Sequence, residues 1–157
     1  IYYGTEQDFE GGNDPGNRER LWDTGYETGG ETFQKIRRLI AIRKGVAPLR
    51  RGDLTIRWAT DRGEGEEDAG VFAFEREYEG ERALVVFNTS FETTSTTSFG
   101  GDAMLTGFSG GATLADVWWD VGGTHTVAGD GTLTLELPPS TAMILVPESV
   151  ASGLELD

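Results

Sequence analysis

Two hydrophobic periodicities divide the chain near residue 50. Before that point, apolar residues recur at helical spacing between Gly29 and Lys44, and they form one stripe of Phe33, Ile36, Leu39 and Ile40. Thr28 and Glu31 have the spacing of a capping box at the start of this segment. Pro48 prevents its continuation. The pattern therefore predicts one amphipathic helix over residues 29–44.

After residue 50 the period changes from helical to two, which is typical of strands. Pairs of glycines, Asp-Gly and Pro-Pro separate the segments, so we expect eight short strands and an antiparallel Greek-key β-sandwich. The expected strands are Leu54–Trp58, Val71–Tyr78, Glu81–Asn88, Thr93–Ser98, Leu114–Trp119, Thr124–Val127, Thr132–Leu137 and Ala142–Val146. Neighbouring strand residues point to opposite faces, so only one of Trp118 and Trp119 is expected in the core. We interpret the other as covering a neighbouring domain, with a sugar-stacking role as the alternative.

The first residues read differently from either pattern. Ile1–Tyr3 is an apolar run without a start signal, which predicts the end of a buried strand, with Tyr2 and Tyr3 as packing residues. We therefore expect the chain to be a piece of a larger protein. After a glycine-rich loop, Asp14 suits a helix N-cap and Pro15 the first helical position.

Asp14 and Arg18 would share one face of that short helix. A carboxylate next to the planar donor fork of an arginine suits the vicinal hydroxyls of a glucose unit. The alternative is a cap with a local ion pair and no ligand.

The composition narrows the classes of partner. Acidic residues number 27 against 13 basic ones, a formal net charge of −14, and only two residues are lysines. Such a surface disfavours nucleic acids and anionic lipids, and no apolar run approaches the ~20 residues that span a bilayer. Without cysteine there are no disulfides or thiolate metal sites. We interpret the charge as adaptation to high salt, with an ordinary acidic enzyme as the alternative.

The remaining polar motifs predict no catalytic residue and no metal site in this chain. The acidic run Asp61–Asp68 lacks the regular ligand spacing of a cation site and favours a solvated loop. His125 is the only histidine, which excludes a histidine metal cluster. Asn88–Ser90 matches the glycan acceptor pattern at a strand end. A carboxylate pair drawn from Glu6, Asp8 and Asp14 would lie on a loop that does not fix its separation.

Several of these segments resemble the α-amylase family of glycoside hydrolases, its fungal-type α-amylases and cyclodextrin glucanotransferases most of all. Tyr2–Gln7, Gly12–Pro15 and Asn17–Arg18 resemble the last barrel strand and the loop that follows it. Arg43–Lys44 and Pro48–Arg50 resemble the exit from the last barrel helix. Val71–Arg76 and Leu84–Asn88 resemble early strands of the family's C-terminal β-domain.

The resemblance implies three segments and a role for each. Residues 1–48 would be a remnant of the (β/α)8 barrel with its last strand, substrate loop and last helix. Residues 49–148 would be the C-terminal β-sandwich, and residues 149–157 an acidic tail that frays. In the family the residues that match Asp14 and Arg18 line the non-reducing side of the substrate cleft. The resemblance therefore implies that both bind glucan, and it favours a dual role for them, as cap and as sugar contacts. The family's catalytic carboxylates sit on earlier barrel strands, so this chain would itself be non-catalytic.

The parent protein would be a secreted, retaining enzyme that hydrolyses α-1,4-glucosidic bonds in starch and related α-glucans. The resemblance implies no cofactor in this chain and leaves room for calcium elsewhere in the parent. A cyclodextrin glucanotransferase-type transglycosylase and a non-catalytic carbohydrate-binding module are the alternatives. The apolar helical stripe lacks the barrel sheet it would cover in the family, so we also expect a homodimer through residues 1–44.

Overall fold

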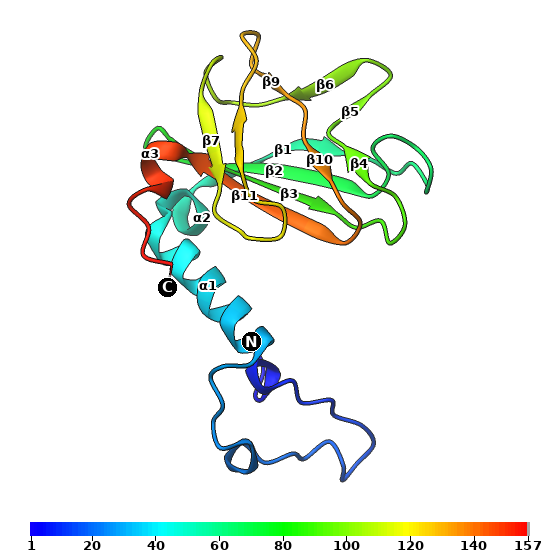
Figure 1. Cartoon of the computed structure of the whole chain (residues 1–157), viewed down its shortest axis with the longest axis vertical. Helices are drawn as coiled ribbons and strands as arrows, with labels where there is room; N and C mark the ends of the chain where they lie inside the picture. The colour runs from blue at the N-terminus through cyan, green and yellow to red at the C-terminus, as the bar shows by residue number, and fades with distance from the viewer. Residues whose placement is uncertain (157) are drawn as a thin grey trace. The chain divides into compact units, whose positions relative to one another are not determined.

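The computed structural model describes residues 1–156, which fall into two compact units (Figure 1). The loop unit comprises Ile1–Ile42 together with the last residues from Glu155 onward. The sandwich unit comprises Arg43–Leu154. No helix among the described residues is long and apolar enough to cross a bilayer.

The loop unit is built from two 3-10 helices, η1 (Thr5–Gln7) and η2 (Leu21–Thr24), and the larger part of helix α1 (Glu31–Gly45). Polar contacts close its loops: the Gln7 side chain donates to the Glu27 carbonyl at 2.7 Å, and the Thr32 hydroxyl donates to Asp8. Among the described residues of this unit, only Gly4 and Ile42 are buried. Hydrogen bonds therefore hold the loop unit together more than a hydrophobic core does.

Two predicted elements of the loop unit are wrong. Ile1–Tyr3 forms no strand, and the Thr5 N–H instead donates to the Tyr2 carbonyl at 3.1 Å in a turn. A strand needs a neighbour for its backbone groups, and no described segment pairs with this one. The short helix after Asp14 is likewise a turn, in which Gly16 N–H donates to Asn13 O at 2.7 Å. Gly16 disfavours a helix, and the segment has no apolar face to bury.

The predicted amphipathic helix is confirmed as α1, which begins at Glu31 because the first helical backbone bond runs from Gln34 N–H to Gly30 O at 3.0 Å. Pro48 does not simply end the helix: it lies in the first turn of a second helix, α2 (Ala47–Arg51). Ile42 and Val46, which flank the end of α1, are buried. Leu39 and Ile40 of the predicted stripe remain exposed.

The sandwich unit confirms the predicted antiparallel β architecture (Figure 1). Its main sheet has the order β1-β2-β3-β11-β7-β8, and every neighbouring pair is antiparallel. The chain leaves this sheet after β3 and returns to it with β7 and β8. It adds β11 later, between β3 and β7, in the crossed connection of a Greek key. The six strands are β1 (Asp53–Ala59), β2 (Val71–Tyr78), β3 (Glu81–Asn88), β7 (Thr113–Asp116), β8 (Thr124–Thr126) and β11 (Thr141–Pro147).

Short strands form the second layer of the sandwich. β10 (Glu136–Leu137) pairs with β4 (Ser95–Thr96), while β6 (Asp102–Leu105) pairs with both β5 (Ser98–Phe99) and β9 (Thr132–Leu133). The core comprises buried apolar side chains from both layers, among them Val71, Leu84, Val86, Met104, Leu114, Leu133, Leu135, Leu137, Met143 and Leu145. The opposite face of the main sheet carries a cluster of phenylalanine rings, Phe72, Phe74 and Phe87.

The predicted strands agree best where the alternation is longest. β2 and β3 have the predicted bounds, and the turn between them has positive φ angles at Glu79 (52°) and Gly80 (84°), as a tight hairpin requires. The predicted strand at 132–137 is split into β9 and β10. The Thr97 hydroxyl accepts from Leu135 N–H at 2.9 Å and donates to Leu133 O at 3.0 Å, so a side chain interrupts the ladder there.

The acidic tail begins with more structure than predicted. Residues Glu148–Ala151 form helix α3, which packs on β7 and β11. The Leu154 side chain lies against Gly45, where an added Cβ would come within 2.4 Å of it. A predicted frayed segment is therefore ordered at its start.

Candidate functional site

The loop unit contains an open cleft of about 480 Å³. That volume falls in the range of small-molecule sites in proteins. Aromatic and charged side chains dominate its lining: Tyr2, Tyr3, Phe9, Trp22, Glu10, Arg18, Glu19 and Arg20. Apolar ring surface beside a few polar groups is the usual composition of a ligand site.

The aromatic side of the cleft is fixed by Tyr3. Its ring meets Phe9 edge-to-face with 5.9 Å between centroids, and its hydroxyl accepts a hydrogen bond from Leu21 N–H at 2.8 Å. Gly4 lets the chain fold back here, since it has a φ of 81° and an added Cβ would lie 2.0 Å from the Phe9 ring. Tyr2 and Tyr3 are therefore exposed cleft residues, and the prediction that they are packing residues is wrong.

The structure brings the two sequence-predicted site residues together. Arg18 Nε lies 2.9 Å from Asp14 Oδ1, in an ion pair four residues apart, and both side chains are exposed. Arg18 lines the cleft, whereas Asp14 contacts Arg18 from outside the lining. The pair is the local contact that the sequence predicted, formed on a turn instead of a helix. Its contact with a glucan stays a prediction.

The charges of the cleft are balanced although the chain is strongly acidic. The lining contains two acidic residues, Glu10 and Glu19, and two basic residues, Arg18 and Arg20. The Glu19 carboxylate also accepts a hydrogen bond from Gly11 N–H at 3.0 Å, which fixes one loop across the cleft. A site with no excess of either sign suits a neutral ligand that offers many hydroxyl groups.

Trp22 is one of the cleft residues that no sequence motif indicated. It lies on η2 and is 60% exposed, and the Arg20 guanidinium lies 5.8 Å from its ring centroid. Arg20 is held by Asp23, whose Oδ2 lies 2.9 Å from both Arg20 Nε and Nη2. A lone tryptophan in a polar loop carries no periodicity. Only its exposure in the folded chain reveals it.

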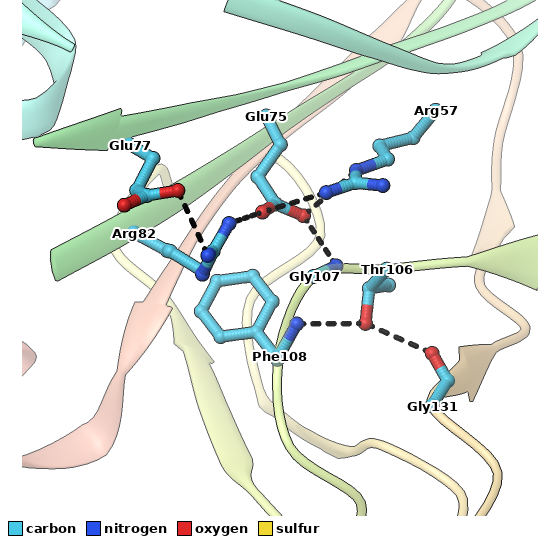
Figure 2. A network of polar contacts seen from close by, with 8 residues as sticks. All are labelled: Arg57, Glu75, Glu77, Arg82, Thr106, Gly107, Phe108 and Gly131. Carbon is cyan, nitrogen blue, oxygen red and sulfur yellow. Dashed lines mark hydrogen bonds and ion pairs between the residues drawn. The ribbon is translucent and has the colours of Figure 1, made fainter. Parts of the chain in front are cut away.

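A second polar cluster lies in the sandwich unit, centred on Glu75 (Figure 2). This side chain follows Val71 and Ala73 on the core side of β2 and is 1% exposed. Its carboxylate accepts from Arg57 Nε and Nη2 at 3.1 Å, from Arg82 Nη1 at 2.7 Å and from Gly107 N–H at 2.8 Å. Gly107 is required there, because an added Cβ would lie 2.3 Å from Glu75 Oε1.

The network keeps Glu75 ionised. Burial raises the pKa of Glu75, but the Gly107 N–H and the guanidinium groups of Arg82 and Arg57 outweigh burial and leave the pKa below its usual value. A carboxylate saturated by four donors is a poor general acid and has no free oxygen to attack a substrate. We therefore interpret Glu75 as a structural lock that joins β1, β2, β3 and the turn after β6.

The alternatives left open by the sequence resolve into structural roles. Asn88 is buried, and its amide nitrogen donates to the carbonyls of Thr93, Leu137 and Pro138 at 2.9–3.0 Å, so it is inaccessible to a glycan. In the acidic run, Asp68 accepts from Trp58 Nε1 at 2.9 Å and from Arg62 Nη1 at 2.6 Å. These contacts tie loops to the sandwich.

The tandem tryptophans follow β7 in a turn and not in a strand. Only one of them is buried, as predicted: Trp118 is buried and Trp119 is exposed, and their rings stack with 4.8 Å between centroids. Asp116 fixes this turn by accepting from the N–H groups of Trp118, Gly122 and Ile144 at 2.9–3.0 Å. Burial nevertheless raises the pKa of the Asp116 carboxyl.

Comparison with known proteins identifies the class of the sandwich. Residues 64–148 match the family model "Alpha amylase, C-terminal all-beta domain". Alpha-amylase 3 of Schizosaccharomyces pombe is 31% identical over 99% of this chain, and a cyclomaltodextrin glucanotransferase of Paenibacillus macerans is 35% identical over 74% of it. The chain therefore belongs to the α-amylase family, which confirms the resemblance.

Solved structures agree with this assignment. A γ-cyclodextrin glucanotransferase from alkalophilic Bacillus clarkii superimposes on 95% of this chain with a TM-score of 0.72 at 27% identity. An Anoxybacillus α-amylase superimposes on 94% of it with a TM-score of 0.69, also at 27% identity. The chain covers 21% and 28% of those two structures, and 25% and 14% of the S. pombe and P. macerans proteins. It thus spans about a quarter or less of the curated relatives named here.

Proposed function

We propose that this chain is the C-terminal part of an α-amylase-type glycosidase that hydrolyses α-1,4-glucosidic bonds in starch and related α-glucans. The loop unit supplies a glucan-binding cleft, and the sandwich unit supplies a supporting β-domain. The observation that carries the proposal is the Arg18 side chain in a charge-balanced, aromatic cleft, paired with Asp14 at 2.9 Å. The family assignment supports the substrate class.

Asp14 and Arg18 act on substrate by positioning it. Asp14 accepts from Arg18 Nε, which orients the planar guanidinium at the cleft. The guanidinium then donates to two neighbouring sugar hydroxyls, and a fixed donor fork selects their spacing. The pair therefore contributes binding and orientation, and not bond cleavage.

Bond cleavage by retention needs two carboxylates about 5–5.5 Å apart on rigid supports. In the loop unit, Asp8 accepts a hydrogen bond from the Thr32 hydroxyl, and Asp14 is paired with Arg18. In the sandwich unit, the oxygens of Glu75 are occupied. We infer that the catalytic carboxylates belong to another part of the parent, a secreted enzyme.

The test removes the Arg18 guanidinium. Arg18→Ala is expected to weaken binding of maltopentaose to the chain, measured by NMR titration, about tenfold, because a hydrogen bond to a charged group contributes ~1.5–3 kcal/mol. Arg50→Ala is the matched control, since Arg50 is an exposed arginine of α2 outside the cleft lining. Unchanged affinity in Arg18→Ala, or no binding to the native chain, would overturn the proposed role.

A transglycosylase of the cyclodextrin glucanotransferase type is the second candidate. The P. macerans and B. clarkii proteins favour it, because both carry that name and resemble this chain as closely as the amylases do. The products of the intact parent on starch separate the two. Linear maltooligosaccharides support hydrolysis, and cyclic products support transglycosylation.

We also propose that the loop unit self-associates through residues 1–44. Within that unit, an apolar groove is lined by Ile1, Phe33, Ile36 and Ile40. Burying each large apolar side chain stabilises an assembly by ~1.5–3 kcal/mol, so a second copy is a favourable cover. Light scattering at micromolar concentration is expected to give twice the chain mass, and Ile36→Glu is expected to halve it. A monomeric native chain would refute the dimer.

A further inference from the structure

We propose that Trp22 is the stacking platform for a glucose ring in the cleft, which makes it a specificity-determining residue of the site. This inference rests on the proposed glucan-binding function and assigns it a second contact, separate from the guanidinium of Arg18. The observations that carry it are the exposure of Trp22, its fixed backbone and its restrained ring.

Trp22 is the most exposed of the four tryptophans. It is 60% exposed, whereas Trp118 is buried in the sandwich. An exposed ring that lines a cleft offers apolar surface that a ligand can bury. Trp22 lines the same cleft as Arg18, so its apolar surface faces the space that holds the polar donors.

The backbone under Trp22 is fixed before any ligand binds. The preceding residue, Leu21, donates its N–H to the Tyr3 hydroxyl at 2.8 Å. Thr24 donates its hydroxyl to Leu21 O at 2.7 Å, which closes the single turn of η2. Tyr3 thus connects the start of the chain to the segment that carries Trp22. A fixed ring loses little conformational entropy when it takes up a ligand.

The ring itself is restrained by Arg20. The guanidinium lies 5.8 Å from the indole centroid, at the distance of a cation–π contact, and Asp23 holds the guanidinium in place. The Arg20–Asp23 ion pair therefore restrains the Trp22 ring and leaves most of the indole surface exposed. Restraint with exposure is typical of a binding platform.

The chemistry of the cleft selects the ligand class. A pyranose ring presents a face of C–H groups and an edge of hydroxyls. The C–H face buries apolar area on an indole, and the hydroxyls reach charged and amide groups such as Arg18, Glu19 and Asn17. The balanced charge of the lining disfavours sugar acids and amino sugars. A run of unmodified glucose units fits both requirements.

The experiment is an NMR titration of the isotope-labelled chain with maltopentaose. The chain has four tryptophans, and each gives one indole N–H signal. The Trp22 signal is expected to shift and saturate, while the Trp58 signal, whose N–H donates to Asp68, is expected to stay fixed. Trp58 therefore also reports that the sandwich remains folded in each variant.

Substitutions then measure the contribution of the ring. Trp22→Ala is expected to weaken maltopentaose binding about tenfold, and Trp22→Phe to retain most of the affinity because it keeps a stacking face. Tyr26→Ala is the matched control, since Tyr26 is 59% exposed on the same loop and lies outside the cleft lining.

The outcomes of these experiments separate the proposed glucan site from the proposed role of Trp22 as its stacking platform. If Arg18→Ala loses affinity while Trp22→Ala does not, the platform is refuted and the glucan site stands. If the native chain shows no saturable shift, the glucan site is refuted and the platform with it. If Trp22→Ala disturbs the Trp58 signal, that variant is not correctly folded, and the affinity of Trp22→Phe and the titration of the native chain test the platform instead. A Trp22 signal that stays fixed while Arg18 amides shift would then overturn the platform.

Discussion

The loop unit and the sandwich unit are stabilised by different means. In the loop unit, turns and 3-10 helices are closed by hydrogen bonds between exposed groups, and only Gly4 and Ile42 are buried among its described residues. In the sandwich unit, two layers of strands enclose an apolar core, and even a charged side chain, Glu75, is buried, with its hydrogen bonds made to partly buried arginines and to Gly107. The two units therefore differ in how much apolar surface they bury.

This contrast matches a division of labour. Regions with few buried apolar contacts open at low free energy, and binding loops are drawn from such regions. The candidate cleft lies entirely in the loop unit, and no residue of its lining is fully buried. The sandwich unit holds the apolar core of the chain instead. Predictions that perturb one unit and leave the other intact therefore test the comparison.

The largest expected effect comes from the lock of the sandwich. Glu75→Gln leaves two guanidinium groups without their buried counter-charge, and we expect it to lower the free energy of unfolding by about 3–5 kcal/mol. Urea denaturation monitored by tryptophan fluorescence measures this. The control is Glu77→Gln, which removes the exposed partner of Arg82 and is expected to cost at most about 1 kcal/mol. Equal effects of both substitutions would contradict the assigned lock.

The acid side of the stability curve gives a smaller effect of the same lock. Because the pKa of Glu75 is lowered in the folded protein, Glu75 stabilises the fold above its usual pKa of 4.5, and this contribution is lost as the pH falls through its folded-state value. We expect the native chain to lose stability progressively below about pH 4.5, and Glu75→Gln to show a flatter acid limb. Parallel limbs in the two proteins would show that other carboxylates dominate acid unfolding.

The smallest expected effect is that of salt on the melting temperature. Salt screens the exposed charges of both units much more than it screens the buried charge of Glu75. A net charge of −14 repels itself, and at ~1 M salt the Debye length is already ~3 Å, so simple screening is nearly complete there. If the charge is an adaptation to brine, we expect the melting temperature to keep rising between about 1 and about 3 M potassium chloride. A flat or falling melting temperature over that range would favour an ordinary acidic surface.

The sandwich could be predicted well from the sequence because its longest strands show a clear alternation of apolar and polar residues. Val71–Tyr78 and Glu81–Asn88 alternate over eight residues on either side of a turn dipeptide, and both bounds agree with the structure. Helix α1 was predicted by its stripe within two residues at its start. The short strands were predicted less well, since Thr97 interrupts one ladder with its hydroxyl and β6 shows too little alternation to be recognised.

The candidate site could be predicted only in part. The proximity of Asp14 and Arg18 followed from their spacing, because a turn and a helix both bring residues four apart together. The strand predicted at Ile1–Tyr3 does not form, because pairing depends on a neighbouring strand that no local pattern reveals. Trp22 enters the cleft through the contact of Leu21 with Tyr3, eighteen residues away in sequence. Such contacts are tertiary and leave no periodic trace.

The position of β11 has a consequence for how the chain folds. β11 is the last strand in sequence, yet it pairs with β3 on one side and β7 on the other. Asn88 is opposite Thr141, so the sheet closes across a span of more than fifty residues. Pairings of this range are slow to form. During synthesis, the edge of β3 that will pair with β11 stays unpaired until β11 has been made. In that interval, β3 can pair with a wrong strand or aggregate.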